Sequence, residues 1–306
     1  MKSNQVQKVS DVPKFLDSFD TFLLDCDGVL WRGSTLLPHT KEVLQQLRSM
    51  GKRLLFVTNN STKSREDYKK VFAKFGIEVS ADEVISSSSA VAHYLKDEAH
   101  FTKTAYVVGE AGITRELDAL GISWIGGVDH KENMTMQELE HIELDPRIGA
   151  VVVGLDTNIN YRKVAYAQLH LRNRPETLFL ATNADSTFPS AGHMLPGSGT
   201  MVAMVEACSG RKALVIGKPS KTLIDLVVHQ YGLDKERTCM VGDRLNTDIQ
   251  FGLNGGISTL LVLTGVTTEE ELMSPDNPTH PHHYIPAFGD LLLASSSSHL
   301  LLRNTT

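Results

Sequence analysis

Two aspartates, Asp25 and Asp27, stand one residue apart at the point where a predicted strand ends. The apolar residues 22–24 before them predict a buried parallel strand, and Gly28 after them permits a turn. Open α/β sheets carry their chemistry at this edge, beyond the carboxyl ends of the strands. Two neighbouring carboxylates repel each other unless a cation or a shared proton separates them. The pair is therefore a candidate catalytic centre, although an ordinary Asp-Gly turn explains it equally well in isolation.

Polar side chains also follow three further predicted strands. They are Thr58 with Asn59 and Asn60, then Lys218, and finally Asp243 with Asp248 behind it. Each has an ordinary alternative as a strand-end or helix-cap residue, a solvated lysine, a turn or an acid in the first turn of a helix. Because four such strand ends in register are an improbable coincidence, we expect these side chains to share one edge of a sheet.

The chemistry of this set is coherent. Three acids at one edge favour a hard divalent cation with oxygen ligands, most simply Mg²⁺. One carboxylate can act as a nucleophile, and a second carboxylate two residues later can act as a general acid and then as a base. A hydroxyl, an amide and an ammonium group can hold the oxygens of a phosphoryl group. The cation and Lys218 would also reduce the repulsion between a phosphate dianion and an aspartate.

Strands and helices alternate along most of the chain, which predicts an α/β fold with a doubly wound, Rossmann-like parallel sheet. The predicted strands are 22–24, 53–58, 84–85, 106–109, 122–125, 150–154, 178–182, 214–217, 239–242, 260–263 and a weak one at 284–285. The predicted helices include 12–19, 40–50, 64–75, 90–96, 161–171 and 200–208. Residues 129–146 are expected to form an exposed excursion, and residues 183–199 a loop rich in turn-forming residues.

Composition narrows the class of protein. The net charge of −6 and the dispersed basic residues argue against nucleic-acid binding, and no apolar run is long enough to span a bilayer. Residues 1–10 are polar, without the apolar centre of a signal peptide, and are expected to be loosely attached, as is the Ser-rich tail 295–306. The three cysteines have neither metal-ligand nor disulfide spacing, which fits a reducing cytoplasm. Cys26 would be open to oxidation if it were exposed.

Four motifs carry a resemblance to a known family. The stretches DCDGVLW, FVTNNSTKSR, GKPS and MVGDRLNTD together resemble the motifs of the haloacid dehalogenase-like phosphatases. They are most similar to the branch of 4-nitrophenylphosphatases, phosphoglycolate phosphatases and pyridoxal phosphatases, over roughly residues 15–290. The resemblance implies that Asp25 attacks phosphorus and forms an aspartyl-phosphate, and that Asp27 protonates the leaving alcohol and then activates water. The other implied roles are phosphate binding by Thr58, Asn59, Asn60 and Lys218, Mg²⁺ binding by Asp25, the Asp27 carbonyl and Asp243, and support of the metal by Asp248.

The spacing of the motifs then implies a domain organisation. The interval from Asp25 to Thr58 is too short for the helical cap of the superfamily's phosphomutases, whereas Thr58 to Lys218 holds an entire α/β block. The resemblance therefore implies a core of residues 1–103 and 212–306 with an α/β cap domain of residues 104–211. Such a cap closes over the site, excludes water and selects the leaving group. The resemblance also implies a homodimer formed through the cap.

The loop 183–193 is predicted to overhang the site, and we therefore use its sequence to predict the class of substrate. Pyridoxal phosphatases carry a histidine near the position of Phe188, and His193 is the nearest candidate to replace it. The loop is closer to fungal 4-nitrophenylphosphatases, which favours small phosphorylated acids such as 2-phosphoglycolate. Pyridoxal phosphate, phosphoserine proteins, phosphoryl transfer to an alcohol and non-catalytic phosphate binding stay open as alternatives. His280, His282 and His283 are expected to lie in a solvated loop rather than at a metal.

Overall fold

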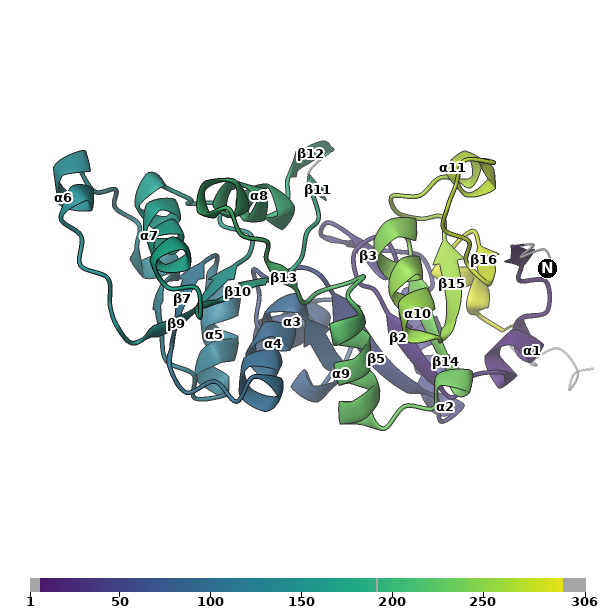
Figure 1. The fold of residues 1–306 in the computed structure, drawn as a ribbon. Coiled ribbons are helices and arrows are strands. Elements are labelled where there is room, and N and C mark those ends of the chain that lie inside the picture. The colour runs from purple at the N-terminus through teal and green to yellow at the C-terminus, as the bar shows by residue number, and fades with distance from the viewer. Residues whose placement is uncertain (1–5, 191, 294–306) are drawn as a thin grey trace, which may run out of the picture.

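The computed structural model describes residues 6–190 and 192–293 of the chain as two parallel β-sheets that form two lobes (Figure 1). All seven strands of the larger sheet are parallel. Their spatial order is β1 (Gln7–Lys8), β16 (His283–Ile285), β15 (Ser258–Val262), β14 (Thr238–Gly242), β2 (Thr21–Leu24), β5 (Arg53–Thr58) and β6 (Val84–Ser86). The predicted α/β fold with a doubly wound parallel sheet is confirmed, and β2, which lies beside the central strand β14, ends at the aspartate pair.

Helices on this lobe begin and end where the sequence provides caps. Ser64 and Asp67 form a capping box at the start of α3, and Gly51, with φ +72°, follows the end of α2. The helices of this part of the chain are α1 (Val12–Asp17), α2 (Thr40–Ser49), α3 (Arg65–Lys74), α4 (Ser87–His93), α9 (Lys221–Tyr231), α10 (Gln250–Gly255) and α11 (Glu269–Met273). Single helical turns occur at η1 (Ala81–Glu83), η2 (Tyr94–Glu98), η4 (Lys235–Arg237), η5 (Leu245–Ile249) and η6 (Phe288–Leu291).

The second lobe, drawn in teal and green in Figure 1, contains a five-stranded parallel sheet. Its order is β13 (Leu214–Val215), β10 (Leu178–Ala181), β9 (Ile148–Val153), β7 (Thr104–Val108) and β8 (Trp124–Gly126). Its helical elements are α5 (Ala111–Ala119), η3 (Gly127–Asp129), α6 (Met136–Glu140), α7 (Tyr161–Asn173) and α8 (Ser198–Ser209). Every residue of β7 and β9 is buried, as expected for parallel strands covered on both faces.

Strand β13 corrects the expected path of the chain between the lobes. The sequence pattern assigned residues 214–217 to the resumed first sheet, but β13 pairs in parallel with β10 of the second sheet. Backbone hydrogen bonds from Ile216 and Gly217 continue that pairing up to the residue before Lys218. We therefore move the second boundary of the proposed cap from residue 211 to about residue 217, while the division into core and cap stays a proposal.

Other expectations about loops were wrong. The loop 183–199 contains a hairpin of β11 (Thr187–Ser190) and β12 (His193–Pro196), which stands above the junction of the lobes in Figure 1. A second short hairpin, β3 (Trp31–Arg32) with β4 (Thr35–Leu36), follows the aspartate pair. Within the polar start, β1 pairs with β16, so that part of it is attached to the sheet edge. The tail 295–306 lies outside the described residues.

Of the three histidines near the C-terminus, His280 and His282 are exposed as expected, whereas His283 lies half-buried in β16. His282 Nδ1 lies 2.9 Å from the Thr259 hydroxyl, and the half-buried His283 packs edge-on against Phe15 with ring centroids 5.2 Å apart. Among the described residues they belong to no group of potential metal ligands, and no helix there is long and apolar enough to cross a membrane.

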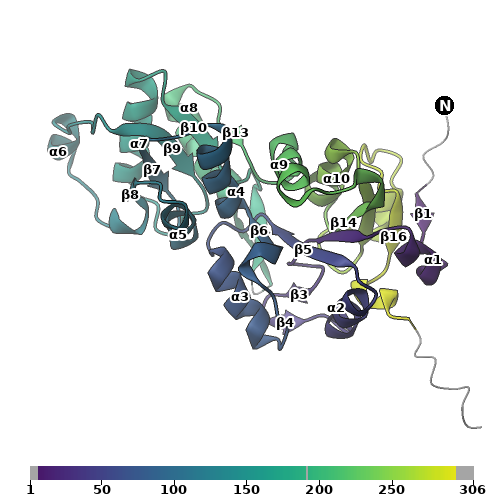
Figure 2. The same cartoon turned by 90° about the horizontal axis from the view of Figure 1, so that it is seen from below.

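A shared apolar cluster joins the two lobes. It includes Leu23 and Leu55 of the larger sheet together with Val107 and Val152 of the smaller one. Helices α4 and α5 contact each other where the lobes meet (Figure 2). Because this apolar cluster is continuous between the lobes, the second lobe is packed against the first rather than joined to it by the chain alone.

A buried histidine lies on helix α7 of the second lobe. His170 on α7 is 0% exposed, and neither ring nitrogen has a hydrogen-bond partner among the described residues. Its ring packs edge-on against Tyr166, with centroids 4.8 Å apart. Burial, together with the charge of Arg174, lowers the pKa of His170 from 6.5 to about 4, and Asp145 opposes the change only in part. The folded state therefore holds the neutral imidazole.

The contribution of His170 to the free energy of unfolding should therefore fall with acidification. The unfolded chain binds a proton at His170 below its ordinary pKa, whereas the folded chain does so only near pH 4, so stability is lost between these values. Between pH 7 and pH 5 the wild type should lose about 2 kcal/mol of unfolding free energy more than His170→Leu. Urea unfolding at both pH values measures this difference. The exposed His229→Leu variant is the control, and equal pH dependence of wild type and His170→Leu would contradict the prediction.

Candidate active site

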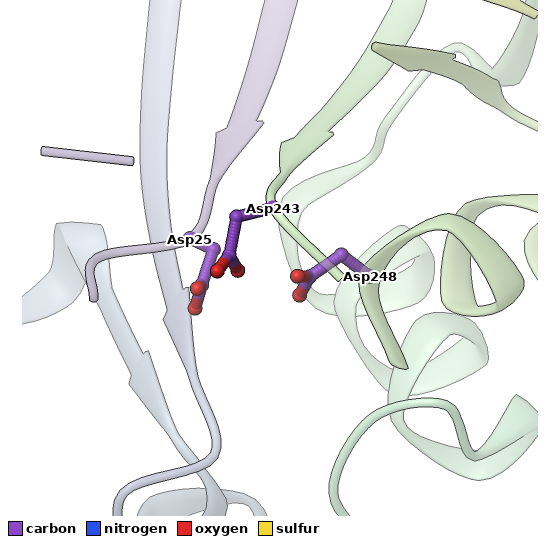
Figure 3. A group of neighbouring side chains, drawn as sticks. All are labelled: Asp25, Asp243 and Asp248. Atoms are coloured by element: carbon purple, nitrogen blue, oxygen red, sulfur yellow. The ribbon is translucent and has the colours of Figure 1, made fainter. Parts of the chain in front are cut away.

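Three carboxylates converge at the carboxyl edge of the larger sheet (Figure 3). Asp25 directly follows β2, Asp243 directly follows the neighbouring β14, and Asp248 projects from η5. One oxygen of each carboxylate lies within 4.8 Å of the others. Adjacent parallel strands end side by side, so the first two acids meet because of the sheet register. The expected convergence of these acids at one edge is what the structure shows.

Lys218 supplies the cation between two of these acids. Its Nζ lies 2.6 Å from Asp25 Oδ1 and 2.7 Å from Asp248 Oδ1, and it donates a hydrogen bond of 2.8 Å to the Val57 carbonyl. The lysine is 2% exposed, so little water screens these contacts. Burial lowers the pKa of Lys218, but Asp248 and Asp25 raise it by more, and the side chain stays charged.

One lysine does not balance three buried carboxylates. Burial raises the pKa of Asp25 well above its ordinary value, although the Lys218 ammonium opposes this. Burial also raises the pKa of Asp243 to about 7, with a further contribution from the negative charge of Asp248. An all-oxygen donor set with surplus negative charge suits a hard divalent cation. Asp25, Asp243 and Asp248 are the one such group among the described residues.

Asp27 lies at the mouth of the site, outside this group. It is exposed, and its Oδ1 accepts a hydrogen bond of 3.0 Å from the indole nitrogen of Trp31. The protein atoms around the carboxyl raise its pKa, and the Trp31 bond only partly offsets them. A carboxyl that is accessible and more readily protonated than usual is suited to proton transfer. Cys26, between the two aspartates, is 0% exposed, so the condition for its oxidation is not met in this structure.

The polar residues after β5 form a loop beside Lys218. Thr58 is buried, and its hydroxyl accepts a hydrogen bond of 3.2 Å from the Asn60 amide. Asn60 Oδ1 accepts hydrogen bonds from the amide and hydroxyl of Thr62. Asn59 Nδ2 donates to Asp185 Oδ2 at 2.8 Å and to the Lys218 carbonyl at 2.9 Å. The side chain of Asn59 is thus already engaged within the protein, whereas a role in phosphate binding was expected for it.

The two residues expected to select the substrate lie on the β11–β12 hairpin. Phe188 is half-buried and pairs with Leu195, and the exposed His193 pairs with Ser190 near the hairpin turn. Among the described residues, neither side chain makes a hydrogen bond or ion pair with Asp25, Asp27 or Asp243. Their role as specificity residues stays a prediction.

Sequence reasoning missed the residues that fit around the acids. Asp185 of the second lobe contacts Arg244 as well as Asn59, and only its place in a loop predicted to overhang the site hinted at this. Two glycines lie against the Asp243 carboxylate: an added Cβ would come within 2.4 Å of its Oδ2 at Gly28 and within 1.7 Å at Gly265. The only signals in the sequence were the pairs Asp27-Gly28 and Thr264-Gly265 at strand ends. A close approach between loops that are distant in sequence cannot be predicted from such local patterns.

Comparison with known proteins agrees with this geometry. A family model described as haloacid dehalogenase-like hydrolase matches residues 22–123, and a second, HAD-hydrolase-like model matches residues 215–291. Phosphoglycolate phosphatase 2 of Arabidopsis thaliana is 43% identical over 296 residues, which cover 94% of this chain and 97% of that protein. The 4-nitrophenylphosphatase of Schizosaccharomyces pombe is 40% identical, covering 94% of this chain and 98% of that protein. The chain belongs to the haloacid dehalogenase-like hydrolases, as expected, and its curated relatives include named phosphatases.

Solved structures resemble the whole described architecture. The crystal structure of a 4-nitrophenylphosphatase from Thermotoga maritima superposes with a TM-score of 0.76 at 33% identity, covering 91% of this chain and 98% of that one. A glycerol phosphate phosphatase from Mycobacterium tuberculosis in complex with magnesium gives a TM-score of 0.75 at 27% identity, covering 90% of this chain and 77% of that one. Both lobes, and not the larger sheet alone, are therefore features of the family.

The close approach at Gly28 can be tested against a glycine with similar backbone geometry. Gly28 has φ +86° and contacts Asp243, whereas Gly33 has φ +60° and an added Cβ there meets nothing within 4 Å. Both Gly→Ala variants introduce strain in the left-handed region, but only Gly28→Ala adds an overlap with a carboxylate. We expect Gly28→Ala to lose about 1–3 kcal/mol more unfolding free energy than Gly33→Ala. Urea unfolding measures both, and equal losses would contradict the role of the contact.

Proposed function

We propose that this phosphatase hydrolyses small phosphate monoesters through an aspartyl-phosphate at Asp25, with Mg²⁺ as its cofactor. The observation that carries the proposal is the convergence of Asp25, Lys218 and Asp243 at one strand edge, with Asp27 beside them. A carboxylate 2.6 Å from a buried ammonium group is positioned for an anionic substrate, because the ammonium attracts the phosphoryl oxygens.

The first step is attack on phosphorus. A carboxylate oxygen of Asp25 forms a bond to phosphorus while the bond from phosphorus to the ester oxygen breaks. Asp27 transfers its proton to that oxygen, so the alcohol leaves neutral. Its raised pKa supports this role, because it increases the protonated fraction available as an acid.

The second step reverses the role of Asp27. The now ionised carboxylate takes a proton from water, and the water oxygen attacks phosphorus. The bond between phosphorus and Asp25 breaks, which releases inorganic phosphate and restores both carboxyl groups. The exposure of Asp27 supports this assignment, because the water must reach it from the mouth of the site.

Mg²⁺ is proposed to be held by the carboxylates of Asp25 and Asp243 and by the Asp27 carbonyl, with Asp248 supporting the site. When bound, it neutralises charge on the phosphoryl group and on the acids. The raised pKa values of Asp25 and Asp243 support a bound cation, because they show how strongly the protein disfavours this uncompensated charge. The magnesium complex of the related glycerol phosphate phosphatase is consistent with this choice.

The phosphoryl oxygens are proposed to be held by Lys218 and by the loop of Thr58, Asn59 and Asn60. Support comes from the buried Thr58 and from the contact between Asn59 and the Lys218 carbonyl, which fix the loop beside the lysine. For Asn59 the backbone amide is the more suitable group, since its side-chain amide already donates to Asp185.

The proposed natural substrates are small phosphorylated acids resembling 2-phosphoglycolate. The named relatives include phosphoglycolate, 4-nitrophenyl and glycerol-3-phosphate phosphatases, which supports a small leaving group. Pyridoxal phosphate and phosphoserine proteins are the alternative substrates, and the position of Phe188 where a histidine is typical of pyridoxal phosphatases argues against the former. We also propose a cytoplasmic location, supported by three free cysteines, and a homodimer, supported by the family resemblance.

Replacement of the nucleophile tests the mechanism. Asp25→Asn should reduce kcat for 4-nitrophenyl phosphate by about a thousandfold or more, because an amide cannot form the phosphoenzyme. The control is Asp17→Asn, which changes an exposed aspartate of α1 outside the site and should retain wild-type activity. EDTA should stop the wild-type reaction and Mg²⁺ should restore it. Full activity of Asp25→Asn would overturn the mechanism.

A substrate panel tests the proposed class of leaving group. Phosphate release is measured from 2-phosphoglycolate, 4-phosphoerythronate, pyridoxal 5′-phosphate and a phosphoserine peptide. We expect the highest kcat/KM for one of the two small phosphoacids. A dominant kcat/KM for pyridoxal phosphate or for the peptide would replace the proposed class with the corresponding alternative.

A further inference from the structure

Asp185 contacts two separate loops of the first lobe at once. Its Oδ2 accepts a hydrogen bond of 2.8 Å from Asn59 Nδ2, and its Oδ1 lies 3.3 Å from an amino nitrogen of Arg244. The Asp185 side chain is 13% exposed and that of Arg244 20%, so the ion pair is largely shielded from water. Asn59 follows β5 and Arg244 follows β14, which are the two strands that lead to Thr58 and Asp243. One carboxylate of the second lobe therefore spans both edges of the proposed active site.

The second lobe holds Asp185 firmly. Asn183 Nδ2 donates a hydrogen bond of 2.7 Å to the same carboxylate oxygen that Asn59 contacts. The amide of Gly199, in the first turn of α8, donates a hydrogen bond of 2.9 Å to the Asp185 carbonyl. An added Cβ at Gly197 would lie 2.2 Å from that carbonyl oxygen, so the helix start and the loop are in direct backbone contact. Asp185 consequently moves with α8 and the second sheet.

On the side of the first lobe, the contact reaches the phosphate-binding groups through a single residue. Asn59 donates one amide hydrogen to Asp185 and the other to the Lys218 carbonyl, and its own carbonyl accepts from the Ser87 hydroxyl. Its Oδ1 is buried without a hydrogen-bond partner among the described residues. The orientation of the Asn59 amide therefore depends on Asp185 and on Lys218.

Other ion pairs that join the lobes differ from this one. Arg65 pairs with Glu116, and Arg115 pairs with Asp67, between α3 and α5. These pairs involve none of the proposed phosphate-binding residues. The ion pairs between α3 and α5 therefore already hold the lobes together. Asp185 differs from them because it contacts Asn59, a proposed phosphate-binding residue.

We propose that Asp185 is a positioning residue that fastens the second lobe to the phosphate-binding loop and thereby restricts the size of the leaving group. Separation of the lobes would leave its charge and that of Arg244 unpaired and would free the Asn59 amide. The hairpin that begins at Thr187 lies two residues further along the chain, so the same contact fixes its height above the site. Closure of the second lobe and ordering of the phosphate-binding loop are in this way a single event. The effect on catalysis rests on the proposed function, whereas the fastening does not.

Hydrogen exchange of the full-length protein tests the fastening without any catalysis. Asp185→Ala should accelerate exchange in peptides that cover residues 59–63 and 183–199 while leaving β9 protected. The matched control is Arg115→Ala, which removes the exposed ion pair between the lobes and should leave peptides 183–199 unchanged. Asp185→Asn, which keeps an acceptor for Asn59, serves if the alanine variant does not fold. Unchanged exchange in both segments would overturn the proposal.

Substrate selectivity tests whether Asp185 also restricts the size of the leaving group. For Asp185→Ala, the ratio of kcat/KM for 2-phosphoglycolate to that for a phosphoserine peptide should fall by about tenfold or more, with Asp185→Asn in between. A merely structural role would lower both values equally and leave the ratio unchanged, which would overturn the selectivity role. If the wild type hydrolyses neither substrate nor 4-nitrophenyl phosphate, the proposed function fails, and the exchange experiment still decides the fastening.

Discussion

The contact on which the site depends is the buried ammonium group of Lys218 between Asp25 and Asp248. Removal of three carboxylates from water is costly, and this one lysine offsets only part of the cost. The β2–β14 register brings the first two acids together, and η5 adds the third. The arrangement is thus incomplete as a charge-balanced structure. The same shortage of positive charge favours a divalent cation among these oxygen ligands, and it is why the proposed function needs one before a phosphate dianion can approach Asp25.

Much of this was predictable from sequence, because it follows from local patterns. Short apolar runs ending in Asp25, Thr58 and Asp243 identify parallel strands, and strands of this type share an edge. The capping residues around α2 and α3 likewise determine helix ends locally. The α/β class followed from the alternation of predicted strands and helices, and the family from the four motifs in their order along the chain.

The features that escaped prediction depend on pairing between distant segments. Strand β13 is only two residues long, and nothing in Leu214–Val215 indicates which sheet it joins. The β11–β12 hairpin lies in a stretch rich in turn formers, where two four-residue strands give no clear alternation. Asp185 resembles any loop aspartate until tertiary structure brings Asn59 and Arg244 to it. Local propensity is silent about such contacts, since their energies arise only after the chain has folded.

The path of the chain through β13 has a consequence for how this architecture can be altered. Pairing with β10 continues through Gly217, whose amide donates to the Thr182 carbonyl at 2.7 Å, and the next residue is Lys218. The position of Lys218 in the first lobe is thus determined by β13, the edge strand of the second sheet. A chimera that exchanges the second lobe must preserve this junction and its hydrogen-bond register, because an otherwise well-folded replacement could deliver the lysine one residue out of place.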